Sequence, residues 1–325
     1  MGATAMSDAA DGAHADVTTF DLGFLRAQGV APEIVDGIAR FRDRHPVPAA
    51  LAGRVPRPTA RYLGASVWEQ AAAALLSGRN VLLEGPKATG KNVLAQNLAA
   101  AFGRPEWDVS LHVDADAASL IGADTYADGR VRFRPGPIAC CAAQGGLGVL
   151  DEVNMARSEA LAVLHATLDD RRIIDVPGYD LIRLDDATRF VATMNVGYEG
   201  TRELNEALAS RFVVIAMPEP DVDQIVRLLR DRFPRLTGPA ARQLATLFDE
   251  IRMKCAAGEL SDRVLDLRGL IDAVALMEVG LDARRALEAC VANKAFDAYE
   301  RGLARDVIDA RLPRSLGRRR LFEQG

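Results

Sequence analysis

The chain has 325 residues, 49% of them hydrophobic and 26% charged, which is typical of a soluble globular protein with about two domains. Its 40 basic and 45 acidic side chains give a net charge of −5, which argues against a general nucleic-acid-binding protein, since such proteins carry a basic excess that neutralises phosphates. The sequence has no apolar run of about 18 residues, no signal peptide pattern and no zinc-binding cysteine spacing, so we expect a cytoplasmic protein without a membrane span.

The first part of the chain carries little regular pattern. Residues 1–18 are small, polar and acidic, and we expect them to be disordered. Residues 19–61 form a second segment, whose apolar positions predict two short helices interrupted around Gly29 and Pro32. Four prolines near its end indicate a linker.

Residues 62–218 alternate between helical and strand patterns. The expected strands are 80–84, 107–111, 147–150, 188–194 and 212–216. The expected helices are 65–77, 90–102, 136–145, 157–169 and 203–209. The strands are continuous apolar runs, as parallel strands covered on both faces are, so the sequence predicts a three-layer α/β core with a parallel sheet. Residues 219–325 show only helical periodicity, and we expect a separate all-helical domain.

The strongest motif follows the first of these strands and opens a helix. It reads Gly85-Pro86-Lys87-Ala88-Thr89-Gly90-Lys91-Asn92. Glycines let backbone amides turn inward around an anion, and the start of the helix adds partial positive charge. Lys91 is the compact charge expected to reach the β and γ phosphates. Only four of the 40 basic residues are lysine, so a lysine at this position indicates a chemical requirement.

Asn92 departs from the usual phosphate-binding loop, which has a Ser or Thr whose hydroxyl binds Mg²⁺. A carboxamide oxygen is also a hard ligand, and Asn92 could coordinate Mg²⁺ or hold one of its waters. Equally, Asn92 could be an ordinary residue of the first helical turn, which would leave a weaker metal site. The sequence leaves both interpretations open.

Polar side chains follow the next two central strands. Asp151 and Glu152 end the strand 147–150, and Asn195 ends the strand 188–194. Ligands of open α/β folds bind at the carboxyl ends of the strands. We expect Asp151 to hold the Mg²⁺ hydration shell, Glu152 to act as general base on the attacking water, and Asn195 to orient that water.

Arg211 precedes the last strand and allows two interpretations. It could pair with an acidic residue of its own subunit. Alternatively, it could act as an arginine finger on the nucleotide of an adjacent subunit, where it would be worth about 10³–10⁵ in rate.

Taken together, these elements resemble an AAA+ ATPase, and more narrowly its MoxR branch. The resemblance covers roughly residues 62–300 and rests on the phosphate-binding loop, Leu150-Asp151-Glu152, Thr193-Met194-Asn195 and the segment from Glu206 to Phe212. It implies a β-hairpin at 122–137 and a second hairpin at 171–180. Within 265–270 it makes Arg268 the second sensor, in contact with the γ-phosphate, with Arg263 as the alternate. Val196 stands where the branch often has a proline.

The resemblance also implies a function. Such proteins use ATP and Mg²⁺, form homo-oligomeric rings that are usually hexameric, and carry a helical lid that moves during turnover. They act as chaperones that remodel or mature a protein client, often one with a von Willebrand factor A-type domain. The pore-facing candidates are Tyr126, Arg130, Arg132 and Tyr179, although plain hairpin turns would present the same residues.

Other functional classes have less support in the sequence. An ATP-binding sensor or scaffold with weak hydrolysis is the main alternative, and Asn92 is the reason to consider it. A DNA-dependent motor is disfavoured by the acidic balance of the chain. A GTPase is disfavoured because Asn293-Lys294 lacks the aspartate that a guanine-reading motif needs.

Overall fold

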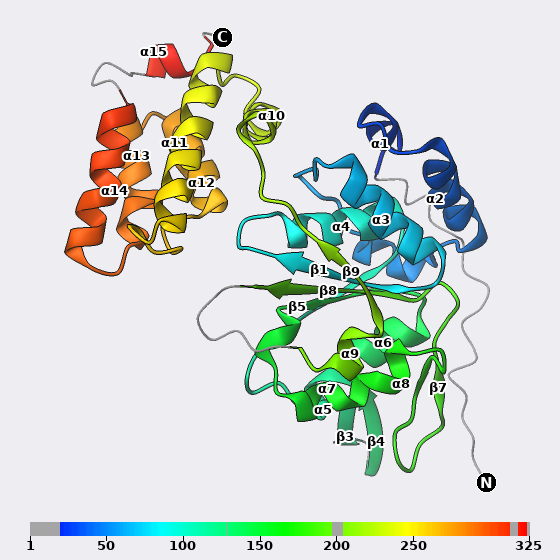
Figure 1. The fold of residues 1–325 in the computed structure, drawn as a ribbon. Coiled ribbons are helices and arrows are strands. Elements are labelled where there is room, and N and C mark those ends of the chain that lie inside the picture. Colours follow the sequence, from blue (N-terminus) through cyan, green and yellow to red (C-terminus); the bar gives the residue numbers. More distant parts are fainter. Residues whose placement is uncertain (1–19, 128, 197–203, 313–317, 324–325) are drawn as a thin grey trace. The chain divides into compact units, whose positions relative to one another are not determined.

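The computed structural model describes residues 20–127, 129–196, 204–312 and 318–323 (Figure 1). The chain divides into two compact units. The first comprises residues 1–86 and 90–217, and the second comprises residues 87–89 and 218–325. Each unit has a hydrophobic core of its own and is described separately.

A five-stranded sheet forms the centre of the first unit, with the strand order β2-β5-β8-β1-β9. The strands are β1 (Asn80–Gly85), β2 (Glu106–Ser110), β5 (Leu147–Asp151), β8 (Arg189–Asn195) and β9 (Phe212–Ala216). All neighbouring pairs are parallel. The register places Gly85 opposite Asn195, and Ser110 opposite Asp151, so the polar strand ends share one edge of the sheet.

Helices cover both faces of this sheet, because successive side chains of each strand point to opposite sides. Val81 and Leu83 enter the core beneath α3 (Ala65–Leu76) and α4 (Lys91–Ala101). Leu82 enters the core on the other face. The helices of that face are α6 (Pro137–Ala143), α7 (Ser158–Leu161), α8 (His165–Leu168) and α9 (Glu206–Ala209) (Figure 1). The predicted three-layer α/β core with a parallel sheet is confirmed.

The N-terminal helices belong to the same core. They are α1 (Gly23–Ala27) and α2 (Pro32–Arg44), and the chain then continues through the 3₁₀ helix η1 (Ala49–Arg54). The apolar face of α2 buries Phe41, whose ring centroid lies 5.2 Å from that of Phe102. Arg42 donates from Nε to the carbonyl of Ala101 at 2.6 Å, at the end of α4. These contacts make residues 20–44 a packed part of the first unit.

Two small antiparallel hairpins extend the first unit. The first follows α5 (Ala117–Leu120) and pairs β3 (Gly122–Ala127) with β4 (Arg130–Pro135). The second pairs β6 (Ile173–Ile174) with β7 (Ile182–Arg183). The first lies within the range 122–137 that the resemblance implies, whereas the second extends to Arg183, three residues beyond the expected range 171–180. The predicted helix 157–169 is instead divided into α7, a 3₁₀ turn η3 (Ala162–Leu164) and α8. Of the predicted helix 203–209, residue 203 lies outside the described residues.

The second unit is helical throughout its described part, apart from one isolated bridge between Leu236 and Phe322. Its elements are α10 (Val222–Arg232), α11 (Gly238–Ala256), α12 (Leu267–Val279), α13 (Ala283–Cys290), η4 (Ala292–Lys294), α14 (Ala298–Arg311) and α15 (Arg318–Leu321). Leu244, Leu270 and Ile308 lie in its core. The predicted all-helical C-terminal region is confirmed. In the part of the chain that the structure describes, no helix is long and apolar enough to cross a membrane.

Candidate active site

The loop between β1 and α4 has a backbone that only certain residues tolerate. Gly90 adopts the left-handed conformation, with φ of +84°, and is the N-cap of α4. A Cβ on Gly85 would lie 2.8 Å from the carbonyl oxygen of Met217 on the neighbouring strand connection. Because the glycine cap has no side chain to accept hydrogen bonds, the amides of the first turn of α4 are suited to an anion. The loop therefore has the features of a phosphate-binding site.

Lys91 lies inside this loop and is 7% exposed. Its Nζ donates to the carbonyls of Gly85 at 2.9 Å and Pro86 at 2.7 Å. Burial lowers the pKa of Lys91 to about 8, and the carboxylates of Asp151 and Glu152 only partly offset this effect. A bound anion would stabilise the protonated lysine, so the desolvated ammonium favours a negatively charged ligand.

Asp151 is held from two sides at the end of β5. The Thr193 hydroxyl of β8 donates to Oδ1 of Asp151, and the Asn92 amide of α4 donates to Oδ2 at 2.9 Å. The same Thr193 oxygen accepts from the backbone N–H of Glu152 at 3.0 Å. One hydroxyl thus fixes both the Asp151 carboxylate and the backbone that carries Glu152.

Glu152 stands on strained backbone and is oriented by an amide. Its φ of 56° and ψ of 47° are left-handed, and it is the N-cap of the 3₁₀ turn η2 (Val153–Met155). Nδ2 of Asn195 donates to Oε1 of Glu152 at 3.2 Å. Nδ2 of Asn154 in turn donates to the backbone carbonyl of Asn195 at 3.0 Å. Left-handed backbone in a residue other than glycine is typical of functional sites whose surroundings impose it.

The structure therefore brings Lys91, Asn92, Asp151, Glu152 and Asn195 together, as the sequence predicts for the edge of the sheet. The residues that connect them, Thr193 and Asn154, have no role that the sequence alone predicts. Thr193 stands inside the quoted Thr193-Met194-Asn195 motif, and its polar side chain in a buried strand was a usable signal. Asn154 follows Glu152 in a turn, and nothing in its local sequence indicates that it supports Asn195.

Arg211 makes three contacts within its own chain. Nε donates to the carbonyl of His165 at 3.1 Å, Nη2 contacts Oδ2 of Asp169 at 3.4 Å, and Nη1 donates to the carbonyl of Ala207. Hydrogen bonds from Arg171, and to a smaller degree from Arg211, lower the pKa of Asp169 to about 2. This arrangement corresponds to pairing within the subunit, the first of the two interpretations that the sequence left open.

Comparisons with known proteins agree with this geometry. The model of a family described as AAA domain (dynein-related subfamily) matches residues 80–212. The Bacillus subtilis protein YojN is 32% identical over 241 residues, which cover 73% of this chain and 79% of YojN. The Staphylococcus haemolyticus protein SH1500 is 31% identical over 250 residues, which cover 75% of this chain and 95% of that protein. Residues 80–212 form an AAA domain of the dynein-related subfamily, and the chain belongs to the same protein family as YojN.

The relatives add no activity, because both are described only as uncharacterized proteins. Among solved structures, that of a RuvB mutant from Thermotoga maritima covers 75% of this chain and 76% of the RuvB chain, with a TM-score of 0.47 and 16% identity. Membership of the AAA family indicates nucleotide binding at the loop described above.

The AAA site has a donor set that fits Mg²⁺. The ion prefers oxygen ligands, keeps several waters and usually takes one or two protein carboxylates together with substrate phosphates. Asp151 supplies such a carboxylate. Asn92 directs its NH₂ group, not its oxygen, toward Asp151, because an ionised carboxylate only accepts hydrogen bonds. Within the described residues, no group of three His, Cys, Asp or Glu side chains could hold an ion by itself.

The two candidate sensor arginines lie in the second unit. Arg268 is exposed on the first turn of α12, where its backbone N–H donates to Asp266 at 2.9 Å. The guanidinium of Arg263 lies over the ring of Phe296, 5.1 Å from its centroid. Their contact with a γ-phosphate stays a prediction.

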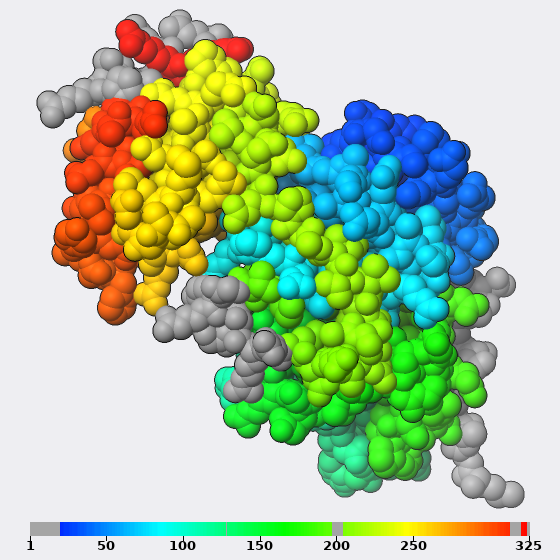
Figure 2. Space-filling view, viewed as in Figure 1, coloured from blue at the N-terminus to red at the C-terminus, as the bar shows by residue number. Residues whose placement is uncertain are grey.

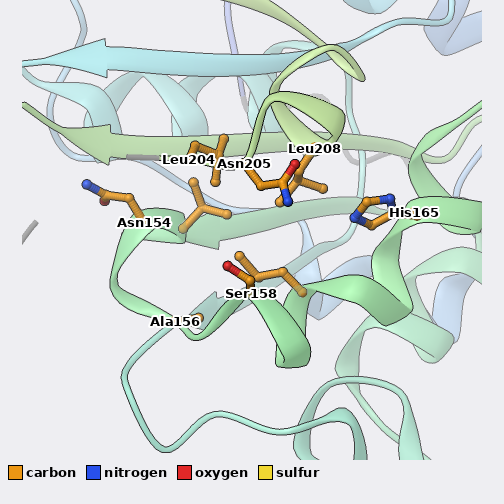
Figure 3. A pocket seen from close by; sticks show the side chains of 9 residues that line it. Asn154, Ala156, Ser158, His165, Leu204, Asn205 and Leu208 are labelled. Carbon is orange, nitrogen blue, oxygen red and sulfur yellow. The ribbon is translucent and has the colours of Figure 1, made fainter. Parts of the chain in front are cut away.

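A small cavity of about 40 Å³ is lined by residues of η2, α7, α8 and the turn that leads into α9. Asn154, Ser158, His165 and Asn205 provide its polar lining (Figure 3). A cavity of this size has room for water, whereas pockets for larger ligands measure about 300–1,000 Å³.

Proposed function

We propose that this AAA protein is a MoxR-like AAA+ ATPase, which hydrolyses Mg-ATP at sites between subunits and uses that energy to remodel or mature a protein partner. The observation that carries the proposal is the Glu152 carboxylate, held by the Asn195 amide beside Asp151 and Lys91. A nucleotide-binding scaffold has no use for an oriented carboxylate on strained backbone, whereas hydrolysis needs a positioned general base.

Each residue of the cluster has a separate task in this proposal. The loop amides and Lys91 bind the phosphates of ATP. Asp151 would hold Mg²⁺, which would supply positive charge beside the phosphates of ATP. Glu152 takes a proton from the attacking water. Asn195 fixes the carboxylate of Glu152, and Asn154 fixes the backbone of Asn195.

The proposal extends to a ring, hexameric by resemblance, in which Arg211 reaches the ATP of the adjacent subunit. In this chain Arg211 is held by an acidic residue and two carbonyls, so ring assembly would have to exchange the 3.4 Å contact with Asp169 for a phosphate contact. A charge pair of that length, partly exposed to solvent, is worth little. Loss of the contact with Asp169 therefore opposes this exchange only weakly.

Mixed assemblies test the finger role of Arg211. We expect Arg211→Ala and Glu152→Gln each to keep nucleotide binding and lose hydrolysis. Combining the two inactive variants should restore part of the activity, because a mixed interface can contain one intact Glu152 and one intact Arg211. If mixtures at several ratios stay as inactive as the separate variants, Arg211 acts only within its own subunit.

One observation favours the alternative of an ATP-binding sensor or scaffold with weak hydrolysis. The Asn92 amide donates to the carboxylate oxygen of Asp151 that a metal ion would need. On this alternative, Asn92→Thr should raise Mg-dependent turnover severalfold, because the hydroxyl would free Asp151 and supply an oxygen ligand. If turnover in the variant is unchanged or lower, the amide does not restrain hydrolysis.

The partner in this proposal is a protein client in the cytoplasm, of the kind that includes von Willebrand factor A-type domains. The two hairpins are the surfaces proposed to contact it, through Tyr126, Arg130 and Arg132 in the first and Tyr179 in the second. Nucleic acid is not the proposed partner, because the chain carries a net charge of −5.

A further inference from the structure

The β3–β4 hairpin is an isolated two-stranded ribbon. Among the described strands, β3 and β4 pair only with each other. The ribbon protrudes from the first unit, at the lower edge of the views (Figures 1 and 2). Tyr126 and Val131, directly opposite each other, are 77% and 61% exposed. These exposures show that the ribbon stands in solvent on the side of Tyr126 and Val131.

The pairing register sorts the ribbon into two chemically different faces, because side chains alternate along each strand. Arg130, Arg132 and Arg134 all fall on one face. They stand opposite Ala127, Thr125 and Ala123. The other face carries the exposed Tyr126 and Val131 together with Asp124 and Phe133. The arginine face therefore has no carboxylate of its own on either strand among the described residues.

The second hairpin supports the ribbon from the mixed face. Tyr179, in the connection between β6 and β7, lies with its ring centroid 5.2 Å from that of Phe133. Its hydroxyl donates to Oδ1 of Asp124 at 2.5 Å. This contact engages the carboxylate of Asp124 and fixes the ribbon, while the three arginines stay exposed on the other side.

We propose that the arginine face of the β3–β4 ribbon, defined by Arg130, Arg132 and Arg134, binds an extended acidic segment of a partner polypeptide. Arg130 and Arg134 form no ion pair with any residue that the structure describes. Alternate residues of a strand are about 7 Å apart, and acidic side chains at alternate positions of an extended peptide repeat at the same interval. The guanidinium groups of Arg130 and Arg134 can then each meet a carboxylate with two parallel hydrogen bonds.

The same face is less suited to nucleic acid. Proteins that bind single strands combine cations with aromatic rings on which the bases stack. Here the aromatic residues Tyr126 and Phe133 lie on the opposite face, and Phe133 is already packed against Tyr179. A nucleic-acid duplex needs a broad basic surface. The ribbon offers only three arginines on one narrow face, and the whole chain has a net charge of −5. The inference rests on the proposed function only in taking the partner to be a protein.

The test is a binding titration with the full chain, with and without ATP, in which fluorescence anisotropy reports binding. The probe is a labelled peptide of about twelve residues in which Glu alternates with Thr, a length that spans the arginine face in an extended conformation. A peptide with Gln in place of Glu and a thymidine oligonucleotide of equal charge serve as comparison probes. The variant is Arg130→Glu/Arg134→Glu. The matched control is Arg40→Glu/Arg57→Glu, which changes the net charge equally at two exposed arginines elsewhere.

We expect the wild type to bind the Glu peptide in preference to the Gln peptide, with weaker binding at higher salt. The ribbon variant should lose about tenfold or more in affinity, and the control less than about twofold. Equal loss in the control, no binding of the Glu peptide in either nucleotide condition, or tighter ribbon-dependent binding of the oligonucleotide would overturn the inference. ATP hydrolysis by the wild type, measured in parallel, separates these outcomes from failure of the proposed function.

Discussion

Replacing Thr193 with valine tests how the site is positioned. Valine keeps the shape of threonine in a strand position that is 1% exposed, but it removes the hydroxyl. That hydroxyl donates to Asp151 and accepts from the backbone N–H of Glu152. The variant would leave an N–H and a carboxylate oxygen short of a partner, which costs about 1–3 kcal/mol. We therefore expect the free energy of unfolding to fall by about that amount.

The effect on turnover should be larger than the effect on stability. Without the Thr193 hydroxyl, the left-handed backbone of Glu152 loses a hydrogen bond that holds it, and such backbone costs about 1–2 kcal/mol. A displacement of about 1 Å at a catalytic group can reduce the rate about 100-fold. We expect Thr193→Val to lower ATP turnover by about 10- to 100-fold, while ATP affinity changes little because the loop and Lys91 are intact.

Steady-state ATPase rates, ATP titrations and urea unfolding of the same preparations measure these effects. Thr193→Ser is the matched control, because it keeps the hydroxyl and loses only a methyl group. Turnover in the serine variant should stay near that of the wild type. Wild-type turnover in Thr193→Val, or an equal loss in both variants, would refute the positioning role.

Two further predictions concern stability and the loop. Burial, together with nearby Asp108, raises the pKa of Glu106 to about 7, and its Oε2 has no partner among the described residues. Because this folded-state pKa lies above the unfolded value, the stability of the wild type should fall as pH rises from about 4.5 through 7. In urea titrations, Glu106→Gln should therefore be about 1–3 kcal/mol more stable than the wild type at about pH 8. The two proteins should be nearly equal in stability at about pH 5. Gly90→Ala should cost about 1–2 kcal/mol and weaken ATP binding, because φ is +84° and the new Cβ would lie 3.2 Å from the Tyr62 ring. Gly53→Ala, whose Cβ meets no atom within 4 Å, is its control, and equal behaviour of the two variants in thermal unfolding and ATP titration would contradict this account.

The sequence predicts the core of the first unit well, because its signals are local. Continuous apolar runs indicate four of the five strands, whereas β2 contains Asp108 and Ser110, and Gly90 with Lys91 marks the start of α4. The region 157–169 was harder. Leu161 and Leu164 repeat at an interval of three, which fits a 3₁₀ turn as well as an α-helix, and the structure places η3 between α7 and α8.

The parts that the sequence could not predict depend on contacts between distant segments. The pattern of residues 20–44 predicts helices, but Phe41 and Arg42 do not show that they pack against the end of α4. Likewise, the roles of Thr193 and Asn154 arise only when neighbouring strand ends meet at the edge of the sheet. From the local sequence, Thr193 is a strand residue and Asn154 is a turn residue. Both descriptions are correct, but they do not include the hydrogen bonds that these residues make with neighbouring strand ends.

The most direct test of the central claim is steady-state hydrolysis of Mg-ATP by the wild type and by Glu152→Gln, at equal and increasing protein concentrations, with ATP binding measured in parallel. Our account predicts that both proteins bind ATP with similar affinity and that wild-type turnover per subunit rises with concentration as the sites between subunits assemble. The variant should show almost no turnover. Equal turnover in both proteins would contradict the assignment of Glu152 as the general base.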